Sequence, residues 1–205
     1  MTDMRSAMRS ICVYCGSSSG TDAAYVEAAR VLGAALAAHN IRLVYGGGTK
    51  GLMGAVAEGA ASAGGKILGI IPKFLLNKEA PDTHKAANVE IVITETMHQR
   101  KHLMFEQSDA FVALPGGIGT VEEIIEMMTW GQLGHHSKPL VFANILGFWD
   151  PMRVMLEHIK GQGFLHSAQN IRMLTIEKAE NIVPQLLGLD EARNADGDAR
   201  IIDRL

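Results

Sequence analysis

Continuous apolar stretches alternate with helical patterns along almost the whole of this 205-residue chain. The stretches are rich in Val, Ile, Leu and Ala and do not alternate with polar residues, as is typical of strands buried on both faces. We expect strands near residues 10–15, 41–45, 66–71, 89–93, 110–114 and 138–143. We expect helices near residues 22–39, 51–63, 97–107, 120–132, 150–161 and 177–187. This order predicts an α/β, Rossmann-like fold, a doubly wound parallel sheet with helices on both faces.

The length and the hydrophobic content of 47% suit one sizeable core rather than two. We expect a single nucleotide-binding catalytic domain over residues 10–187. A flexible N-terminus at 1–9 precedes it, and a polar, charge-mixed C-terminal tail at 188–205 follows.

Charge and hydropathy exclude several classes of protein. A net charge of −3 argues against a nucleic-acid partner, because proteins that bind nucleic acid present a basic face. No apolar run reaches the roughly 20 residues of a membrane span, and residues 1–9 lack the apolar stretch of a signal peptide. Cys12 and Cys15 lie three apart on one predicted strand, so they point to opposite faces and are expected to be buried free thiols. We therefore expect a cytoplasmic protein without a membrane partner.

Three glycine-rich turns follow predicted strands, at residues 15–20, 45–51 and 115–120. The carboxyl ends of parallel strands share one edge of the sheet, so the three turns should meet there. Glycines let the backbone approach a ligand, and the free N–H groups at a helix start attract anions. This predicts a phosphate or nucleotide crevice, with Ser17, Gly47 and Gly48 as candidate substrate contacts at the strand ends.

The second turn formally matches a dinucleotide fingerprint as Gly46-x-Gly48-x-x-Gly51. The next strand, however, ends at Pro72-Lys73 without the carboxylate that would hold a ribose of NAD. A site for a mononucleotide or a single phosphate is favoured, and a turn that only packs a helix against a strand stays an alternative. The histidines show no metal-ligand spacing, so we expect no metal.

The third turn runs into an acidic segment, and the whole reads Pro115-Gly116-Gly117-Ile118-Gly119-Thr120-Val121-Glu122-Glu123. One interpretation is a capping box, in which Thr120 caps the helix and Glu123 reaches back to it. The other is an active-site acid, because helical spacing places Glu123 rather than Glu122 on the side of the turn. We expect Glu123 in the first helical turn, where the helix dipole stabilises the anion and lowers its pKa.

A second capping-box pattern, Thr96-Met97-His98-Gln99, opens the helix that carries Arg100 and Lys101. Basic residues near a helix start oppose the helix dipole. A solvated helix face is one explanation. The other is that Arg100 points to the edge where the glycine turns meet, where its guanidinium could bind phosphate.

These two motifs together resemble the paired signature of the LONELY GUY family, which reads P-G-G-x-G-T-x-x-E in its second part. The resemblance covers residues 10 to 187 and includes the turns at 13–18 and 45–48 and the segment 129–134. Family members are cytokinin riboside 5′-monophosphate phosphoribohydrolases, which release free base and ribose 5-phosphate from N6-modified AMP. The resemblance also implies a Rossmann-like homodimer without a redox cofactor. Many relatives carry a "lysine decarboxylase" label, but no residue pattern here supports pyridoxal phosphate chemistry.

The resemblance implies that Arg100 and Glu123 are catalytic, with Glu123 as an anion that stabilises a ribosyl cation. The substrate-contacting positions that it implies are Glu79, Lys101, Gly116, Gly117, Ile118, Gly119, Thr120, Val121, Glu122 and Thr129. His98, Lys101 and water are candidates for protonating the leaving base. The alternative function is a non-catalytic mononucleotide carrier or sensor, which the glycine turns would serve equally well but which does not require the Arg100 and Glu123 pair.

Overall fold

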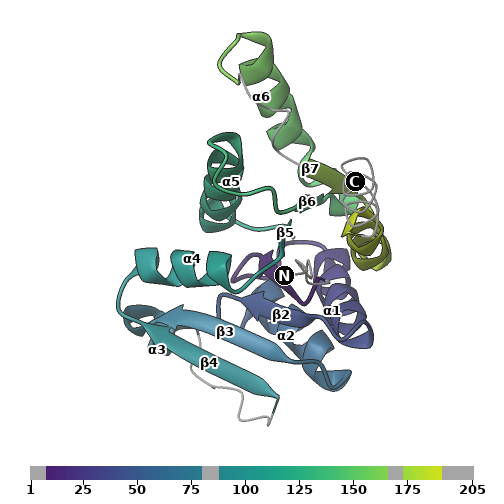
Figure 1. Cartoon of the computed structure of the whole chain (residues 1–205). Helices are drawn as coiled ribbons and strands as arrows, with labels where there is room; N and C mark the ends of the chain where they lie inside the picture. The colour runs from purple at the N-terminus through teal and green to yellow at the C-terminus, as the bar shows by residue number, and fades with distance from the viewer. Residues whose placement is uncertain (1–7, 80–87, 166–172, 191–205) are drawn as a thin grey trace, which may run out of the picture.

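The computed structural model describes residues 8–79, 88–165 and 173–190, and these residues build one seven-stranded sheet. The strand order is β4-β3-β2-β1-β5-β6-β7, and every neighbouring pair is parallel (Figure 1). The strands are β1 (Ser10–Tyr14), β2 (Arg42–Tyr45), β3 (Ile67–Pro72), β4 (Val89–Thr94), β5 (Ala110–Ala113), β6 (Leu140–Ala143) and β7 (Met173–Ile176). The predicted parallel α/β fold is confirmed.

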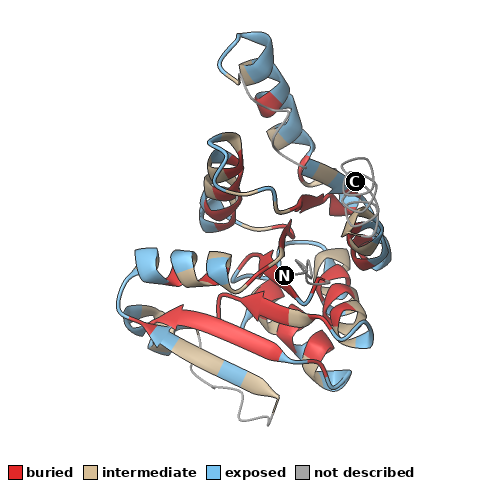
Figure 2. Ribbon diagram, viewed as in Figure 1, coloured by how far each residue is buried: buried red, intermediate tan, exposed pale blue. Residues whose placement is uncertain are grey.

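Helices cover both faces of the sheet, because alternate strand residues point to opposite sides. Ile11 and Val13 of β1 belong to one core, whereas Cys12 and Tyr14 belong to the other. The first core includes side chains of α1 (Ala23–Ala38), α2 (Gly51–Ser62) and the helical run 182–190. The second core includes side chains of α4 (Met97–Glu106), α5 (Ile118–Gln132) and α6 (Asp150–Gly161). The central strands are buried, while the edge strand β4 is partly exposed (Figure 2).

The expected element boundaries are close to the observed ones. Each of the six predicted strands is present with its ends within two residues of the prediction, and Cys12 and Cys15 are buried free thiols as expected. Two elements were not predicted: β7, the partly exposed edge strand of Met173-Leu174-Thr175-Ile176, and the short helix α3 (Leu76–Glu79). The last predicted helix begins later than expected, as a short 3-10 turn, η4 (Ala179–Asn181), that leads into 182–190.

The two ends of the described body are tied together. The Met8 backbone N–H donates to Asp190 Oδ2 at 3.0 Å, and the Met8 side chain is buried. The Arg9 N–H donates to Asp109 Oδ2 at 2.8 Å. Residues 8 and 190, the first and last that the structure describes, therefore lie in contact. The remainder of the predicted N-terminus and tail lies outside the described residues. Within those residues no helix is both long and apolar enough to cross a membrane.

The strand order reverses between β1 and β5, and the loops after these strands flank the crevice where doubly wound folds bind their ligands. All three glycine turns meet there. The Gly16 N–H donates to Pro115 O at 3.1 Å, and Gly16 O accepts from the Leu52 N–H at 3.0 Å. Gly51 adopts φ +58°, and a Cβ on it would lie only 2.4 Å from the Ser17 carbonyl carbon. The predicted common edge is confirmed.

Candidate active site

A pocket of about 320 Å³ opens at this reversal point, on the α4 and α5 side of the sheet. We call it the crevice pocket. Its lining residues come from the first and third glycine turns and from α2, α3, α4 and α5, and are Cys15, Gly16, Ser17, Met53, Glu79, Met97, Arg100, Gly117, Ile118, Gly119, Thr120, Glu122 and Glu123.

Arg100 reaches the crevice because α4 begins directly after β4. The predicted capping box at this start is confirmed, since the Gln99 N–H donates to Thr96 Oγ1 at 3.1 Å and Gln99 Oε1 accepts from the Thr96 N–H. Arg100 lies one turn into the helix and is only 7% exposed. Its Nε donates to Ile70 O at 3.1 Å, and its Nη1 lies 3.4 Å from Glu123 Oε1. The guanidinium thus lies at the sheet edge, as the second interpretation expected.

Gly46 makes room for this guanidinium. A Cβ built on Gly46 would lie 2.2 Å from Arg100 Nη2, closer than any side chain allows. In the sequence, Gly46 is the first glycine of a weak dinucleotide fingerprint. Its role in the fold is to let an arginine from a distant helix lie against the backbone that follows β2.

The helix that carries Glu123 begins earlier than predicted, and the capping box at Thr120 is wrong. The N-cap is Gly117, in an extended conformation, and no side chain of the described residues caps it. Thr120 is the third helical residue, and its hydroxyl packs where a Cβ of Gly116 would lie. The first-turn N–H groups of this 15-residue helix are therefore free at the pocket wall, where they favour an anion.

Because α5 begins earlier than predicted, the position and the pKa of Glu123 also differ from the expectation. The residue lies in the second turn of α5, not the first, and is 7% exposed. Burial raises the pKa of Glu123 to about 7, although Arg100 opposes this and Glu122 adds to it. The predicted downward shift is wrong because burial outweighs both the ion pair and the helix dipole. A carboxyl group with a pKa near 7 exists in both forms at neutral pH and can accept and return a proton.

Lys101 lies between two carboxylates beside the pocket. Its Nζ donates to Glu122 Oε1 at 2.5 Å and to Glu126 Oε1 at 3.1 Å. Burial alone would lower the pKa of Lys101, but these hydrogen bonds raise it above its ordinary value. The ammonium is thus held as a cation. The second carboxylate oxygen of Glu126 is buried without a partner within the described part of the chain.

The crevice pocket brings together nine of the predicted site residues: Ser17, Glu79, Arg100, Gly117, Ile118, Gly119, Thr120, Glu122 and Glu123. Six predicted residues do not line it: Gly47, Gly48, Lys101, Gly116, Val121 and Thr129. Gly47 packs against Ile71 at φ +75°, and the Thr129 hydroxyl donates to Ile125 O within its own helix at 2.8 Å. Substrate contacts of these six residues stay predictions.

Glu79 is placed by the second glycine turn. Its carbonyl oxygen accepts from the Thr49 N–H at 2.8 Å and from the Thr49 hydroxyl at 3.3 Å. This contact fixes the end of α3 against the crevice. Glu79 therefore lines the pocket together with Arg100 and Glu123, and its charge adds to the raised pKa of Glu123.

Three apolar contributors to the pocket were not predicted, namely Met53, Met97 and Cys15. Met97 lies in the same motif as Arg100, so its closeness to Arg100 in the sequence could have predicted it as a pocket residue. Burial raises the pKa of the Cys15 thiol, which keeps it neutral and apolar beside the acid. Among the described residues no cluster of His, Cys, Asp or Glu is placed to hold a metal.

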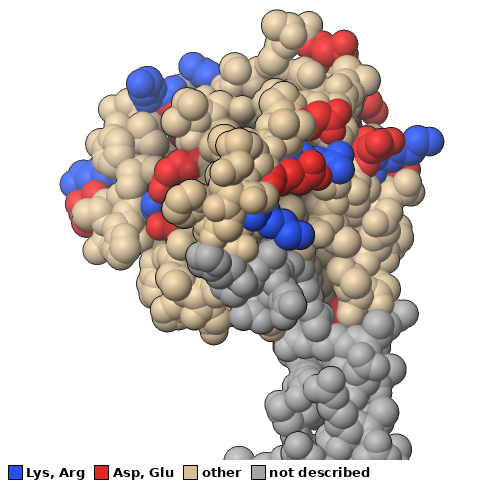
Figure 3. Space-filling view, turned by 90° about the horizontal axis from the view of Figure 1, so that it is seen from above, with Lys and Arg blue, Asp and Glu red and all other residues tan. Residues whose placement is uncertain are grey.

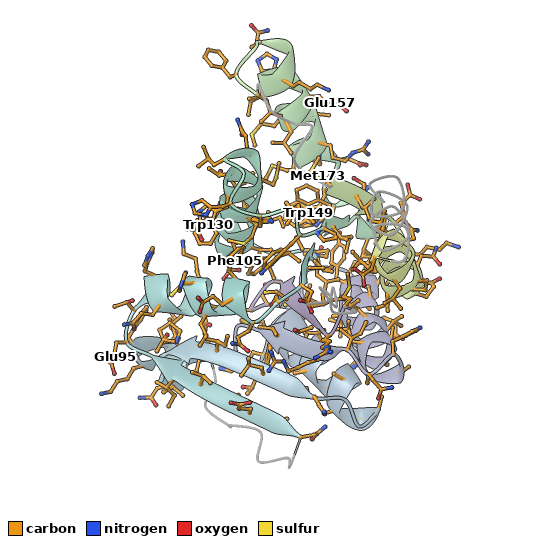
Figure 4. The ribbon with its side chains drawn as sticks, viewed as in Figure 1. Glu95, Phe105, Trp130, Trp149, Glu157 and Met173 are labelled. Carbon is orange, nitrogen blue, oxygen red and sulfur yellow. The ribbon has the colours of Figure 1, made fainter. Side chains whose placement is uncertain are left out.

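Two aromatic contacts hold the neighbouring helices in place. Phe105 of α4 packs edge-on against Trp130 of α5 at 5.0 Å, and the two rings lie between these helices in Figure 4. Phe105 also stacks on Phe111 of β5 at 6.0 Å. The two helices that carry Arg100 and Glu123 are thereby fixed to each other and to the sheet.

The fold and this pocket define a doubly wound α/β protein with a crevice at the point of strand reversal, lined by a buried Arg–Glu pair and by the start of a helix. Known proteins that are similar in sequence identify the family to which this chain belongs. A family model described as "possible lysine decarboxylase" matches residues 53–186. Cytokinin riboside 5′-monophosphate phosphoribohydrolase LOG2 of Arabidopsis thaliana is 44% identical over 191 residues, 93% of this chain and 86% of that protein. The probable phosphoribohydrolase LOGL2 of Oryza sativa subsp. japonica is 42% identical, over 89% of this chain and 76% of that protein. The chain belongs to the LONELY GUY family of cytokinin riboside 5′-monophosphate phosphoribohydrolases.

Solved structures resemble the chain in fold. A molybdenum cofactor binding protein of Rippkaea orientalis superposes with a TM-score of 0.63 at 18% identity, covering 89% of this chain and 97% of that one. The molybdenum cofactor carrier protein of Chlamydomonas reinhardtii gives 0.63 at 21% identity, covering 88% and 99%. At these identities the likeness extends to the Rossmann-like fold alone.

Proposed function

We propose that this chain is a nucleoside 5′-monophosphate phosphoribohydrolase that activates cytokinins. Its substrate is an adenosine 5′-monophosphate, including N6-modified forms, and its products are the free base and ribose 5-phosphate. The observation that carries the proposal is the buried pair of Arg100 and Glu123, 3.4 Å apart, in the same pocket as the uncapped start of α5. Nucleotide binding alone needs the uncapped start of α5 but not the buried ion pair.

In this proposal the 5′-phosphate lies on the first-turn N–H groups of α5, between Gly117 and Thr120. Glycines at 117 and 119 have open space where a Cβ would be, so the backbone can approach the phosphate closely. Binding energy from the phosphate is then available to position the bond that breaks, which lies elsewhere in the substrate. Glu123 follows Thr120 by three residues, about 4.5 Å along the helix axis.

The ribose would lie over Glu123. Cleavage of the ribosyl–base bond develops positive charge on the sugar, which an adjacent carboxylate stabilises. A water oxygen attacks the anomeric carbon as the carbon–nitrogen bond breaks. The electron pair of the broken bond stays on the purine nitrogen. The anionic form of Glu123 orients this water and accepts its proton. Arg100 stays charged, holds the carboxylate and cannot act as the acid.

The leaving purine takes up one proton. Of the candidates, His98 is exposed and outside the pocket lining, and Lys101 is bonded to two carboxylates. We therefore favour water, or the proton that Glu123 has accepted, as the source.

Product analysis over a panel of nucleoside 5′-monophosphates tests the function, with ribosides and free bases as controls. We expect equimolar base and ribose 5-phosphate from AMP and from isopentenyladenosine monophosphate, and no base from the ribosides. Recovery of bound nucleotide in intact form would instead support the carrier or sensor alternative.

We further propose a cytoplasmic homodimer. Support comes from α6, which projects from the body in Figure 1 and carries Val154 and Met155 at 65% and 46% exposure. Phe164, just beyond this helix, is 77% exposed. A second copy would cover such side chains. Light scattering should give twice the chain mass of 22.1 kDa, and the single mass would contradict the dimer.

Basic and acidic side chains are intermixed on the face shown in Figure 3, which agrees with a small-molecule substrate rather than nucleic acid.

A further inference from the structure

A second pocket, of about 230 Å³, lies at the same edge of the sheet on the α1 and α2 side. We call it the aromatic pocket, because Tyr25 of α1 and Phe148 form one wall of it. Their rings meet edge to face at 5.8 Å and 76°. Leu52 and Pro115 add apolar surface, and Ser18 and Ser19 add hydroxyl groups. Of the described residues that line it, none is charged.

The aromatic wall is rigidly supported from beneath. Phe148 packs edge-on against Trp149 at 5.0 Å, and Trp149 is 2% exposed. The Trp149 indole N–H donates to Ala113 O at 3.0 Å, and its backbone N–H donates to Asn144 Oδ1 at 2.7 Å. Figure 4 places Trp149 at the centre of the molecule beside the sheet. The pocket is thus preformed and does not depend on a loop closing.

The two pockets adjoin, because Gly16 and Gly117 line both of them. Along the third glycine turn, Pro115 and Gly116 line only the aromatic pocket, whereas Ile118 to Thr120 line only the crevice pocket. The loop after β1 crosses between the pockets in the same way, with Ser17 on one side and Ser18 on the other. An anion on the first N–H groups of α5 would therefore lie at the passage between the two.

We propose that the aromatic pocket binds an uncharged aromatic ring that is joined to the 5′-phosphate of the nucleotide in the crevice pocket. The ligand class is a nucleoside 5′-phosphodiester whose second substituent is aromatic or heteroaromatic. This inference rests on the phosphate position of the proposed function. One ester oxygen of the phosphate leads to the ribose over Glu123, and the other leads past Gly117 to Tyr25 and Phe148.

A phosphodiester with an aromatic substituent suits the two pockets for two physical reasons. Doubly wound sheets hold dinucleotides across the strand ends at the point of reversal, with one half on either side. The lining of the aromatic pocket offers ring faces and apolar carbon but no cation, so a terminal phosphate would lose its solvation there without compensation. A diester keeps its charge at the helix start and places only the neutral ring in the pocket.

The test compares two probes of equal charge, adenosine 5′-(phenyl phosphate) and adenosine 5′-(methyl phosphate). Their affinities for the full chain are measured by calorimetry, with Glu123→Gln present throughout so that base release does not consume the probes. We expect the phenyl ester to bind at least about tenfold more tightly than the methyl ester, since only its ring reaches the pocket.

Two variants locate the ring. Ser19→Phe fills the pocket from an exposed loop position, and Phe148→Ala removes part of its wall. Both should reduce the preference for the phenyl ester to less than about threefold. Leu146→Ala is the matched control, because Leu146 is an exposed apolar residue of the same loop that does not line the pocket. It should keep the preference.

Equal affinity for the two esters would overturn the proposal, and so would a preference that persists in both pocket variants. Release of adenine from AMP by the unmodified chain is measured separately. It reports on the proposed function, so failure of the aromatic pocket and failure of the phosphoribohydrolase activity are distinguishable.

Discussion

At the scale of single residues, the site depends on one buried ion pair and on the glycine that admits it. Arg100 and Glu123 come from different helices and meet below the surface, where the pKa of the acid is raised to about 7. The arginine could not lie there if Gly46 carried a side chain. Reactivity is thus set by burial and by a close approach of backbone to guanidinium.

Gly46→Ala should displace Arg100 and reduce base release from AMP at least about tenfold. The new Cβ would lie 2.2 Å from the end of a flexible side chain, so the arginine can move and the fold should survive. The rate is measured together with the midpoint of thermal unfolding. Gly161→Ala, with open space around its Cβ, is the control and should behave as the parent does. An unaltered rate in Gly46→Ala would show that base release does not depend on the position of the Arg100 guanidinium.

The activity should depend on pH through Glu123. Below a pKa of about 7 the acid is protonated and above it the acid is an anion, so kcat/KM should rise as the pH increases through 7. Glu122 is one cause of the raised pKa, so Glu122→Gln should move the midpoint of this rise to lower pH. A profile that is flat between about pH 5 and 9 would remove Glu123 as the base.

At the scale of secondary-structure elements, the start of α5 decides what the third glycine turn does. The Thr120 and Glu123 spacing fits a capping box as well as it fits an active site, and the local sequence does not separate the two. Tertiary packing separates them, because Thr120 lies against Gly116 and the helix begins at Ile118, with Gly117 as its N-cap. The first-turn N–H groups are left for a ligand.

The close packing of α1 on α2 supports the β1 and β2 turns from the other face of the sheet. A Cβ on Gly33 of α1 would lie 2.1 Å from Val56 O of α2, and backbone cannot yield as a side chain can. Gly33→Ala should therefore lower the free energy of unfolding by about 1–3 kcal/mol in denaturant titrations. Gly188→Ala, in the helical run 182–190, has free space and should not destabilise. Equal stability of the two variants would contradict the tight helix contact.

At the scale of the whole molecule, the sequence predicts the fold far better than the chemistry of the site. Buried strands are apolar runs in the sequence, so six of the seven strands in the described part of the chain could be predicted. The strand β7 could not, because an edge strand of four residues gives little such signal. The meeting of the glycine turns followed from parallel topology. The contact of Arg100 with Glu123, the raised pKa and the space at Gly46 could not be predicted, since each depends on distances between segments far apart in the chain.

The two sides of the reversal point differ in chemistry. One pocket holds the acid, the arginine and the helix start, and the other is uncharged and aromatic. In the first pocket, we propose, the buried carboxylate of Glu123 promotes cleavage of the ribosyl–base bond of a nucleotide whose phosphate lies at the start of α5.

The most direct test measures adenine and ribose 5-phosphate released from AMP by the parent chain and by Glu123→Gln, alongside the affinity of each for AMP. We expect equimolar products from the parent, a rate lower by about 10² or more in Glu123→Gln, and nearly equal affinity of the two proteins for AMP. Unchanged turnover in Glu123→Gln, or binding by the parent without release of base, would contradict this proposal.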